Sequence, residues 1–120
     1  MPAPRRDIGA RAEELAAAYL VARGLIVVTR NFRTRRGEID IIARDRDTLV
    51  FVEVRLRSRA TFGGAASSIT PAKQARLLAA ARGYLAKLGR EPPCRFDAIL
   101  LDRLDPATIV WERDILDADA

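Results

Sequence analysis

The 120-residue chain contains no histidine and a single cysteine, Cys94. The absence of histidine excludes Ser–His–Asp triads, zinc sites with histidine ligands and nucleases that use a histidine general base. One cysteine cannot form an internal disulfide, and the apolar residues around Cys94 predict a core position rather than a nucleophile. Any acid–base chemistry must therefore use carboxylates, lysine, tyrosine or metal-bound water.

Long apolar runs are absent too. No stretch of the chain approaches the roughly 20 apolar residues of a membrane-spanning helix, and residues 1–6 are not followed by the apolar segment of a signal peptide. We therefore expect a cytoplasmic protein with no membrane partner. Because about half of its residues are apolar, the chain is expected to form one domain over residues 1–120, with its core over about 8–115.

The net charge of +5 is spread unevenly. Residues 97–120 hold seven acidic and two basic side chains, a net of −5, so the preceding 96 residues carry +10. A basic body predicts a polyanionic partner, most simply nucleic acid. Nineteen of the 21 basic residues are arginine, which a GC-rich genome also produces, so clustering is better evidence than the total. The clustered basic residues, which we expect to contact phosphates, are Arg30, Arg33, Arg35, Arg36, Arg55, Arg57 and Arg59.

Hydrophobic periodicity and turn residues predict two helices and five strands. The expected elements are a helix at about 8–23, strands at 25–32, 38–44 and 48–57, a helix at 70–88, and strands at 94–101 and 108–115. Residues 58–69, with Gly63 and Gly64, are predicted to form a mobile loop. The first three strands favour an antiparallel meander, and the long helix after them permits a parallel crossover. The predicted fold class is therefore α/β, a mixed five-stranded sheet flanked by helices.

Two carboxylates are expected side by side in the hairpin formed by strands 38–44 and 48–57. If Arg46 and Asp47 form the tip of the turn, Asp40 lies directly opposite Glu53. Opposed residues of an antiparallel pair share a face, with Cβ atoms roughly 5 Å apart, so two like charges there cost stability. Their simplest use is to hold a hard cation such as Mg²⁺ with oxygen ligands.

Arg55 follows Glu53 by two residues, so its side chain shares that face of the strand. A carboxylate pair beside a cation is the arrangement used in metal-dependent phosphodiester cleavage. Asp40, Glu53 and Arg55 are therefore the candidate catalytic residues. The alternative is a surface hairpin with a local Glu–Arg ion pair.

The predicted order of elements, with Asp40 on the second strand and Glu53 and Arg55 on the third, resembles that of the PD-(D/E)xK nucleases. These nucleases share the restriction-endonuclease-like fold with Holliday-junction resolvases. More specifically, the chain is similar to the YraN family of uncharacterised bacterial proteins. The resemblance covers about residues 9–101, most of the chain. It rests on Gly9 and on segments 12–16, 31–33, 37–43, 51–55, 62–63, 73–74 and 95–97.

The resemblance implies that Asp40 and Glu53 bind Mg²⁺ or Mn²⁺, and that the backbone carbonyl of Val54 completes the site. It adds Glu13 as a further ligand, the alternative being an ordinary helix-surface glutamate. Arg55 stands where these nucleases usually have a catalytic lysine. Because arginine stays protonated, it cannot act as a base, although it can stabilise charge and position a phosphate.

Lys73 lies near the start of the second long helix, where it can reach a phosphate or simply be exposed. The resulting hypothesis is a metal-dependent DNA endonuclease that hydrolyses phosphodiester bonds in branched or otherwise structured DNA. If it cuts both strands of a junction, a homodimer is expected. Alternatives are a non-catalytic nucleic-acid-binding or partner-recruiting module on the same fold, and a protein-interaction scaffold without salt-sensitive DNA binding.

Overall fold

The computed structural model describes residues 5–56 and 69–116. Its elements are α1 (Arg5–Ala22), β1 (Ile26–Arg33), β2 (Glu38–Asp45), β3 (Thr48–Leu56), α3 (Pro71–Leu88), β4 (Cys94–Leu101), the 3-10 turn η1 (Pro106–Thr108) and β5 (Val110–Glu112). The strands form one sheet in the order β1-β2-β3-β4-β5, antiparallel throughout except for the parallel pair β3–β4. The predicted meander, crossover and mixed five-stranded sheet are confirmed.

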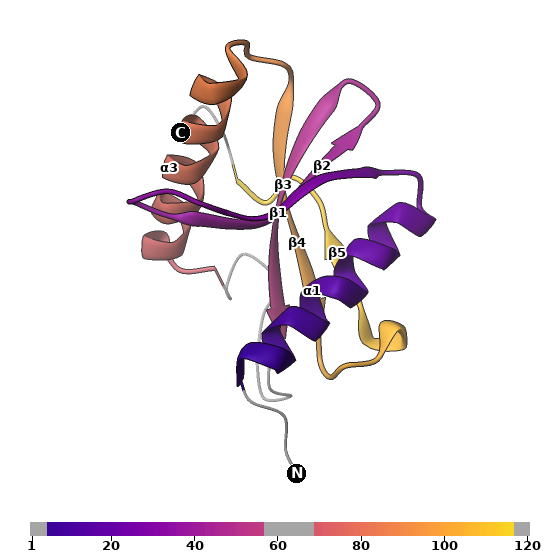
Figure 1. Ribbon diagram of the computed structural model, residues 1–120. Helices are drawn as coiled ribbons and strands as arrows, with labels where there is room; N and C mark the ends of the chain where they lie inside the picture. Colours follow the sequence, from indigo (N-terminus) through magenta and orange to yellow (C-terminus); the bar gives the residue numbers. More distant parts are fainter. Residues whose placement is uncertain (1–4, 57–68, 117–120) are drawn as a thin grey trace.

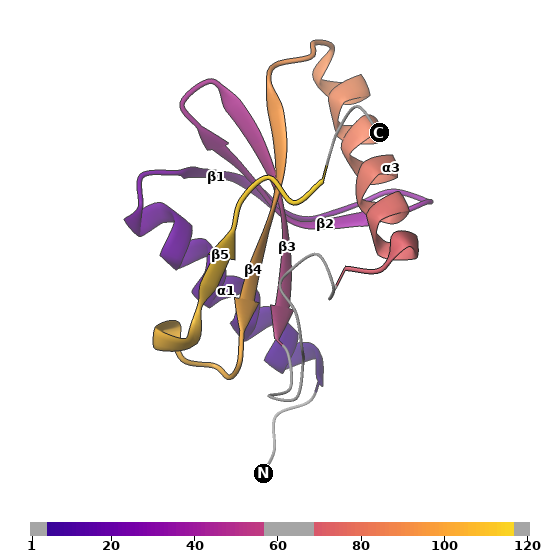
Figure 2. The same cartoon turned by 180° about the vertical axis from the view of Figure 1, so that it is seen from behind.

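Helices α1 and α3 lie on opposite sides of the sheet (Figures 1 and 2). Successive residues of β3 point to opposite faces, so each face supplies its own apolar cluster. The buried residues of the cluster under α1 are Ala12, Ala16, Leu20, Leu25, Ile41, Ala43, Val50, Val52, Ile99 and Leu101. Those of the cluster under α3 are Ile39, Ile42, Leu49, Phe51, Leu77, Ala80, Ala81, Phe96 and Leu116. Cys94 packs against the second cluster, in agreement with its predicted core position.

One face of β3 changes from core to open surface along its length. Leu49 and Phe51 are buried under α3, whereas Glu53 and Arg55, which follow at the same spacing, are only partly buried. The residue following this strand, Arg57, lies outside the described residues. A sheet that is covered at one end and open at the other leaves room for a site at the boundary.

Strand β2 departs from regular alternation around Asp40. Strict alternation would put Ile39 and Ile41 on one face, but Ile39 joins the cluster under α3 and Ile41 the cluster under α1. In β1, Asn31 has a left-handed φ of 56°, between residues that pair with Ile41 and Ile39. Both strands therefore depart from regular geometry beside Asp40.

The turn between β1 and β2 is fixed against α3. The Thr34 hydroxyl oxygen accepts hydrogen bonds from the backbone N–H groups of Arg36, at 3.3 Å, and Gly37, at 3.2 Å. A Cβ atom built on Gly37 would overlap the backbone carbonyl of Arg76 in α3. Glycine is needed here because the two backbones approach too closely for a side chain.

The observed boundaries differ from the predicted ones at both ends of the chain. Helix α1 begins at Arg5, a turn earlier than predicted. Strand β5 is much shorter than 108–115, because residues 106–108 form a 3-10 turn whose first N–H groups are capped by Asp105, with Ala107 N–H donating at 2.9 Å. Most of the predicted loop at 58–69 lies outside the described residues. Within the described part of the chain, neither helix has the length and apolar character needed to cross a membrane.

Candidate functional site

The register of the β2–β3 hairpin sets the positions of the two candidate carboxylates. In this hairpin Asp45 pairs with Thr48 at one end and Ile41 pairs with Val52 at the other, which leaves Arg46 and Asp47 as the tip. The ladder ends at Ile41–Val52, one residue before Asp40 and Glu53, where β2 departs from regular alternation. The predicted turn is confirmed, and the two carboxylates approach each other closely enough for a side-chain hydrogen bond, although no ladder pair joins them.

Asp40 and Glu53 interact with each other in a partly desolvated setting. Asp40 Oδ2 accepts a hydrogen bond from the Val54 backbone N–H at 2.8 Å. Burial, the Asp40 charge and the hydrogen bond to Asp40 together raise the pKa of Glu53 from 4.5 to about 8, while the Arg55 charge opposes the shift. Burial also raises the pKa of Asp40, while its bonds to Val54 and Glu53 oppose that shift. At neutral pH the pair therefore shares a proton, which a bound cation would displace.

Glu13 of α1 faces the same site. Its side chain is only 15% exposed, and its Oε1 atom is buried without a hydrogen-bond partner among the described residues. Arg30 Nη2 lies 3.8 Å from Oε1, which is an ion pair but too long for a hydrogen bond. Burial, then the Asp40 charge, raises the pKa of Glu13, and a hydrogen bond with Asn31 opposes this. The neighbouring Glu14 is exposed, so Glu13 differs from an ordinary surface glutamate.

The donors present suit a hard divalent cation. Carboxylate oxygens are the ligands that Mg²⁺ and Mn²⁺ prefer, and Mg²⁺ usually takes only one or two carboxylates, with waters and substrate phosphate completing its shell. Across residues 5–56 and 69–116, no three acidic or cysteine side chains gather closely enough to form a complete metal cage. The orphaned Oε1 of Glu13 and the shared proton of the Asp40–Glu53 pair are nevertheless features that a cation would resolve.

A pocket of about 220 Å³ opens beside the carboxylate pair. Its lining residues are Glu38, Glu53, Arg55, Lys73 and Arg76. Two of the predicted basic residues, Arg55 and Lys73, therefore lie at the same pocket as Glu53. Glu38 is at the rim, where its Oε2 atom lies 3.3 Å from Nε of Arg33.

Arg76 is a basic lining residue that the sequence analysis missed. It belongs to no recognised motif and is one of many arginines in the chain. The available signal was its spacing, because Arg76 follows Lys73 by three residues and so shares a helix face with it. Only the packing of Gly37 against the Arg76 backbone shows that this face meets the β1–β2 turn.

A second pocket, of about 240 Å³, adjoins the first over the β1–β2 turn. Its lining residues are Arg33, Thr34, Arg35, Arg36, Gly37, Glu38 and Arg76. The structure thus brings Arg33, Arg35 and Arg36 together. The other two predicted phosphate contacts, Arg57 and Arg59, lie outside the described residues.

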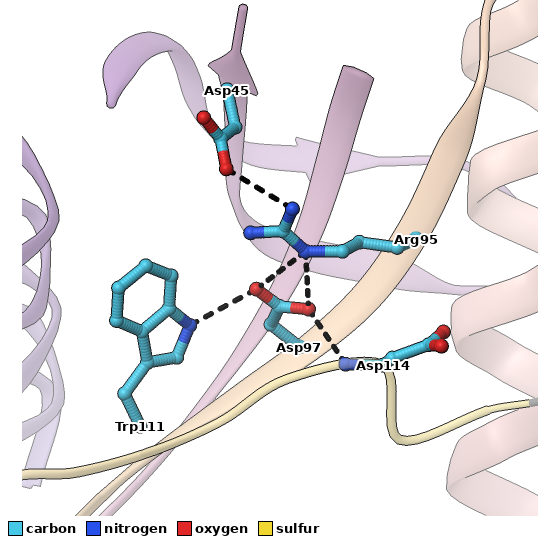
Figure 3. A network of polar contacts seen from close by, with 5 residues as sticks. All are labelled: Asp45, Arg95, Asp97, Trp111 and Asp114. Carbon is cyan, nitrogen blue, oxygen red and sulfur yellow. Dashed lines mark hydrogen bonds and ion pairs between the residues drawn. The ribbon is translucent and has the colours of Figure 1, made fainter. Parts of the chain in front are cut away.

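A different carboxylate, Asp97 of β4, is fully buried and fully bonded (Figure 3). It accepts hydrogen bonds from Arg95 Nε at 3.1 and 3.2 Å, from Trp111 Nε1 at 3.0 Å and from the Asp114 backbone N–H at 2.9 Å. Arg95 Nη1 also bonds to Asp45 Oδ2 at 3.1 Å. The Arg95–Asp97 pair is thus part of a network that joins β2, β4 and β5.

Comparison with known proteins gives the chain a family. The model of the uncharacterised protein family UPF0102 matches residues 12–101, a range that includes Glu13, Asp40, Glu53 and Arg55. A UPF0102 protein of Cupriavidus taiwanensis is 55% identical over 117 residues, which cover 97% of this chain and 87% of the relative. A UPF0102 protein of Nitrosococcus oceani is 52% identical over 94% of both chains. One from Methylobacillus flagellatus is 50% identical over 94% of this chain and 99% of its own. The chain therefore belongs to UPF0102, a YraN-like family of uncharacterised bacterial proteins.

Proposed function

We propose that this protein is a metal-dependent DNA endonuclease that hydrolyses phosphodiester bonds with Mg²⁺ or Mn²⁺. The observation that carries the proposal is the partly buried Asp40–Glu53 pair at the edge of a pocket that also holds Arg55 and Lys73. The order of helices and strands, with the acidic residues on β2 and β3, is also that expected of a restriction-endonuclease-like fold. That fold is part of the proposal.

Each residue has a distinct role in this mechanism. Asp40 and Glu53 would hold the cation, with the Val54 carbonyl as a further ligand, and Glu13 of α1, whose pKa the Asp40 charge raises, would add negative charge to the site. A bound cation supplies Lewis acidity and an activated water. Arg55 shares the pocket with Glu53 and, as a permanent cation, steadies the scissile phosphate and the charge that develops on it.

The substrate is proposed to be branched or otherwise structured DNA, recognised through its backbone. The side chains around the carboxylates that are available for contact are arginine and lysine, which bind phosphate groups whatever the base sequence. If both strands of a junction are cut, two copies of the chain related by a two-fold axis provide the two active sites.

A second candidate function is a non-catalytic nucleic-acid-binding module on the same fold. It is favoured by Arg55, which cannot replace a lysine that exchanges protons. The two functions differ in their need for metal. A nuclease requires Asp40 and Glu53 to bind it, whereas a binding module keeps its affinity and its function without them.

A cleavage assay separates these functions. Labelled branched, flapped, single-stranded and duplex DNA is incubated with the protein in Mg²⁺, Mn²⁺ or EDTA, beside Asp40→Asn. The matched control is Asp47→Asn, an exposed aspartate at the tip of the same hairpin. Metal-dependent cleavage that is lost in D40N and kept in D47N supports the nuclease. DNA binding without cleavage of any substrate supports the binding module.

A further inference from the structure

We infer that one sugar–phosphate strand runs through both pockets described above, and that Arg76 binds a phosphate at the boundary between them. This inference relies on the proposed function for the class of ligand, nucleic acid, but not for the cleavage of that ligand. It assigns Arg76 as a binding residue and gives the strand a direction, from the carboxylate pair towards the β1–β2 turn.

The two pockets adjoin each other, and we call their combined lining the basic groove. Glu38 and Arg76 line both of them, so the pockets meet along these two side chains. Glu53 and Lys73 mark the first pocket, and the arginines of the β1–β2 turn mark the second. A strand whose phosphate reaches Glu53 therefore passes Arg76 before it leaves over the turn.

The charge of the basic groove suits a polyanion. Its lining contains six basic side chains, Arg33, Arg35, Arg36, Arg55, Lys73 and Arg76, and two acidic ones, Glu38 and Glu53. Glu38 already pairs with Arg33. A larger pocket of about 540 Å³ at the β2–β3 tip lacks this excess, since its lining has three arginines and two aspartates: Arg23, Arg46, Arg113, Asp45 and Asp47.

The frame of the basic groove is fixed before a ligand binds. The Gly37 backbone packs on that of Arg76, and the Thr34 hydroxyl holds the turn closed. At the start of α3, the Thr70 hydroxyl oxygen caps the helix by accepting the Lys73 backbone N–H at 3.2 Å. A strand that binds here orders side chains but not the backbone, which lowers the entropic cost of binding.

The contacts available in the basic groove are to phosphates rather than to bases. Proteins that grip single-stranded bases stack them on aromatic rings, and no aromatic side chain is found among the lining residues that the structure describes. Pockets of about 220 and 240 Å³ have room for one sugar–phosphate backbone, so a duplex would lay one of its two strands in the groove. Binding through this groove should therefore be independent of base sequence and strongly dependent on salt.

The test is a salt titration of DNA binding in EDTA, where no cleavage occurs. Fluorescence anisotropy is measured from 50 to 200 mM salt with two labelled duplexes of unrelated sequence, for the wild type, Arg76→Ala and Lys73→Ala/Arg76→Ala. The matched control is Arg82→Ala, which removes another exposed arginine of α3 that lies outside the basic groove. Because both arginine side chains are exposed, thermal melting should show that the variants remain folded.

For Arg76→Ala, the slope of log K against log salt should become shallower by about 0.9, the value for one lost phosphate contact, and equally for both sequences. The double variant should lose about twice as much, and Arg82→Ala should match the wild type. Equal slopes for Arg76→Ala and Arg82→Ala would overturn the inference. So would wild-type binding that does not respond to salt.

This outcome is separable from that of the cleavage assay. Slope changes at Arg76 in a protein that cuts no DNA would leave the inference standing and remove the nuclease. Metal-dependent cleavage together with an unchanged salt slope in Arg76→Ala would support the nuclease and overturn the inference.

Discussion

Two carboxylate clusters in this small sheet face the same physical problem and resolve it differently. Asp97 is 0% exposed, and its two oxygens accept hydrogen bonds from a guanidinium, an indole and a backbone amide. Among the described residues, Asp40 accepts one backbone N–H bond, from Val54, and its side-chain partner is a second acid, Glu53, which competes with it for a proton. Both groups are removed from water, but only the first is compensated by the protein itself.

The difference separates a structural cluster from a functional one. A fully bonded buried carboxylate ties strands together and has nothing left to offer a ligand. A like-charged pair beside an open pocket lowers the stability of the fold until something neutralises it, which is typical of a site whose missing component is a ligand. Four substitutions or additions test this contrast.

The largest effect is expected at Asp97. Asp97→Ala removes the acceptor of Arg95 Nε and of the Trp111 indole, leaves the partly buried guanidinium with Asp45 alone, and should lower the free energy of unfolding by about 3–5 kcal/mol. Urea denaturation measures this. The control is Asp114→Asn, because Asp114 contributes its backbone N–H and asparagine tolerates its φ of 56°. A loss below about 1 kcal/mol at Asp97 would remove the contrast between the two clusters.

Substitution of Glu53 is expected to have the opposite effect and to raise the free energy of unfolding. Because its folded pKa, about 8, exceeds its ordinary value of 4.5, the folded state binds more protons than the unfolded state between these values. Wild-type stability should therefore fall as pH rises from about 4.5 to 8 and level off above that. Glu53→Gln should be more stable than wild type by about 1–3 kcal/mol at pH 8 and equal to it at pH 4. A Tm series across pH measures this, and an E53Q variant that is less stable at pH 8 contradicts it.

Addition of a divalent cation should partly reproduce that gain in the wild type. A cation that binds only the folded state at ten times its Kd adds about 1.4 kcal/mol to the free energy of unfolding. Thermal melting at pH 8 with Mn²⁺ or Mg²⁺, against NaCl of matched ionic strength, should show a higher Tm. The same increase in Asp40→Asn would place the cation elsewhere.

The smallest effect is expected at Glu13. Its charge is partly compensated by Arg30 and Asn31, so Glu13→Gln should stabilise the protein by no more than about 1 kcal/mol at pH 8. Its neighbour Glu14 is exposed, so Glu14→Gln is the matched control and should change the Tm very little. Identical melting curves for the two variants at every pH would mean that Glu13 is an ordinary surface residue.

The sequence alone predicted the features of the site that depend on residues close together in the chain. The two-residue hairpin tip and the pairing of β2 with β3 as far as Ile41–Val52 can be read from the chain, and they bring Asp40 near Glu53. The residues that bond to Asp97 were not predictable in this way. Trp111 and Asp114 lie 14 and 17 residues beyond it, and they reach it only because β5 returns beside β4 after a 3-10 turn.

Arg76 was missed for a similar reason. Its place in the basic groove depends on how α3 packs against the β1–β2 turn, which no local pattern encodes. The distortion of β1 and β2 at Asn31 and Asp40 was also unforeseen, because Asn31 sits in a run of residues that otherwise favours a regular strand.

The backbone contact between Gly37 and Arg76 has a consequence for how this family can vary. The width of the basic groove is set by two main chains in contact, whereas most of its charge is set by side chains at other positions. Width and charge are therefore independent variables. Substitutions at positions 33, 35, 36 and 73 can retune affinity for one polyanion or another without reshaping the channel, whereas any side chain at position 37 would force the turn and the helix apart.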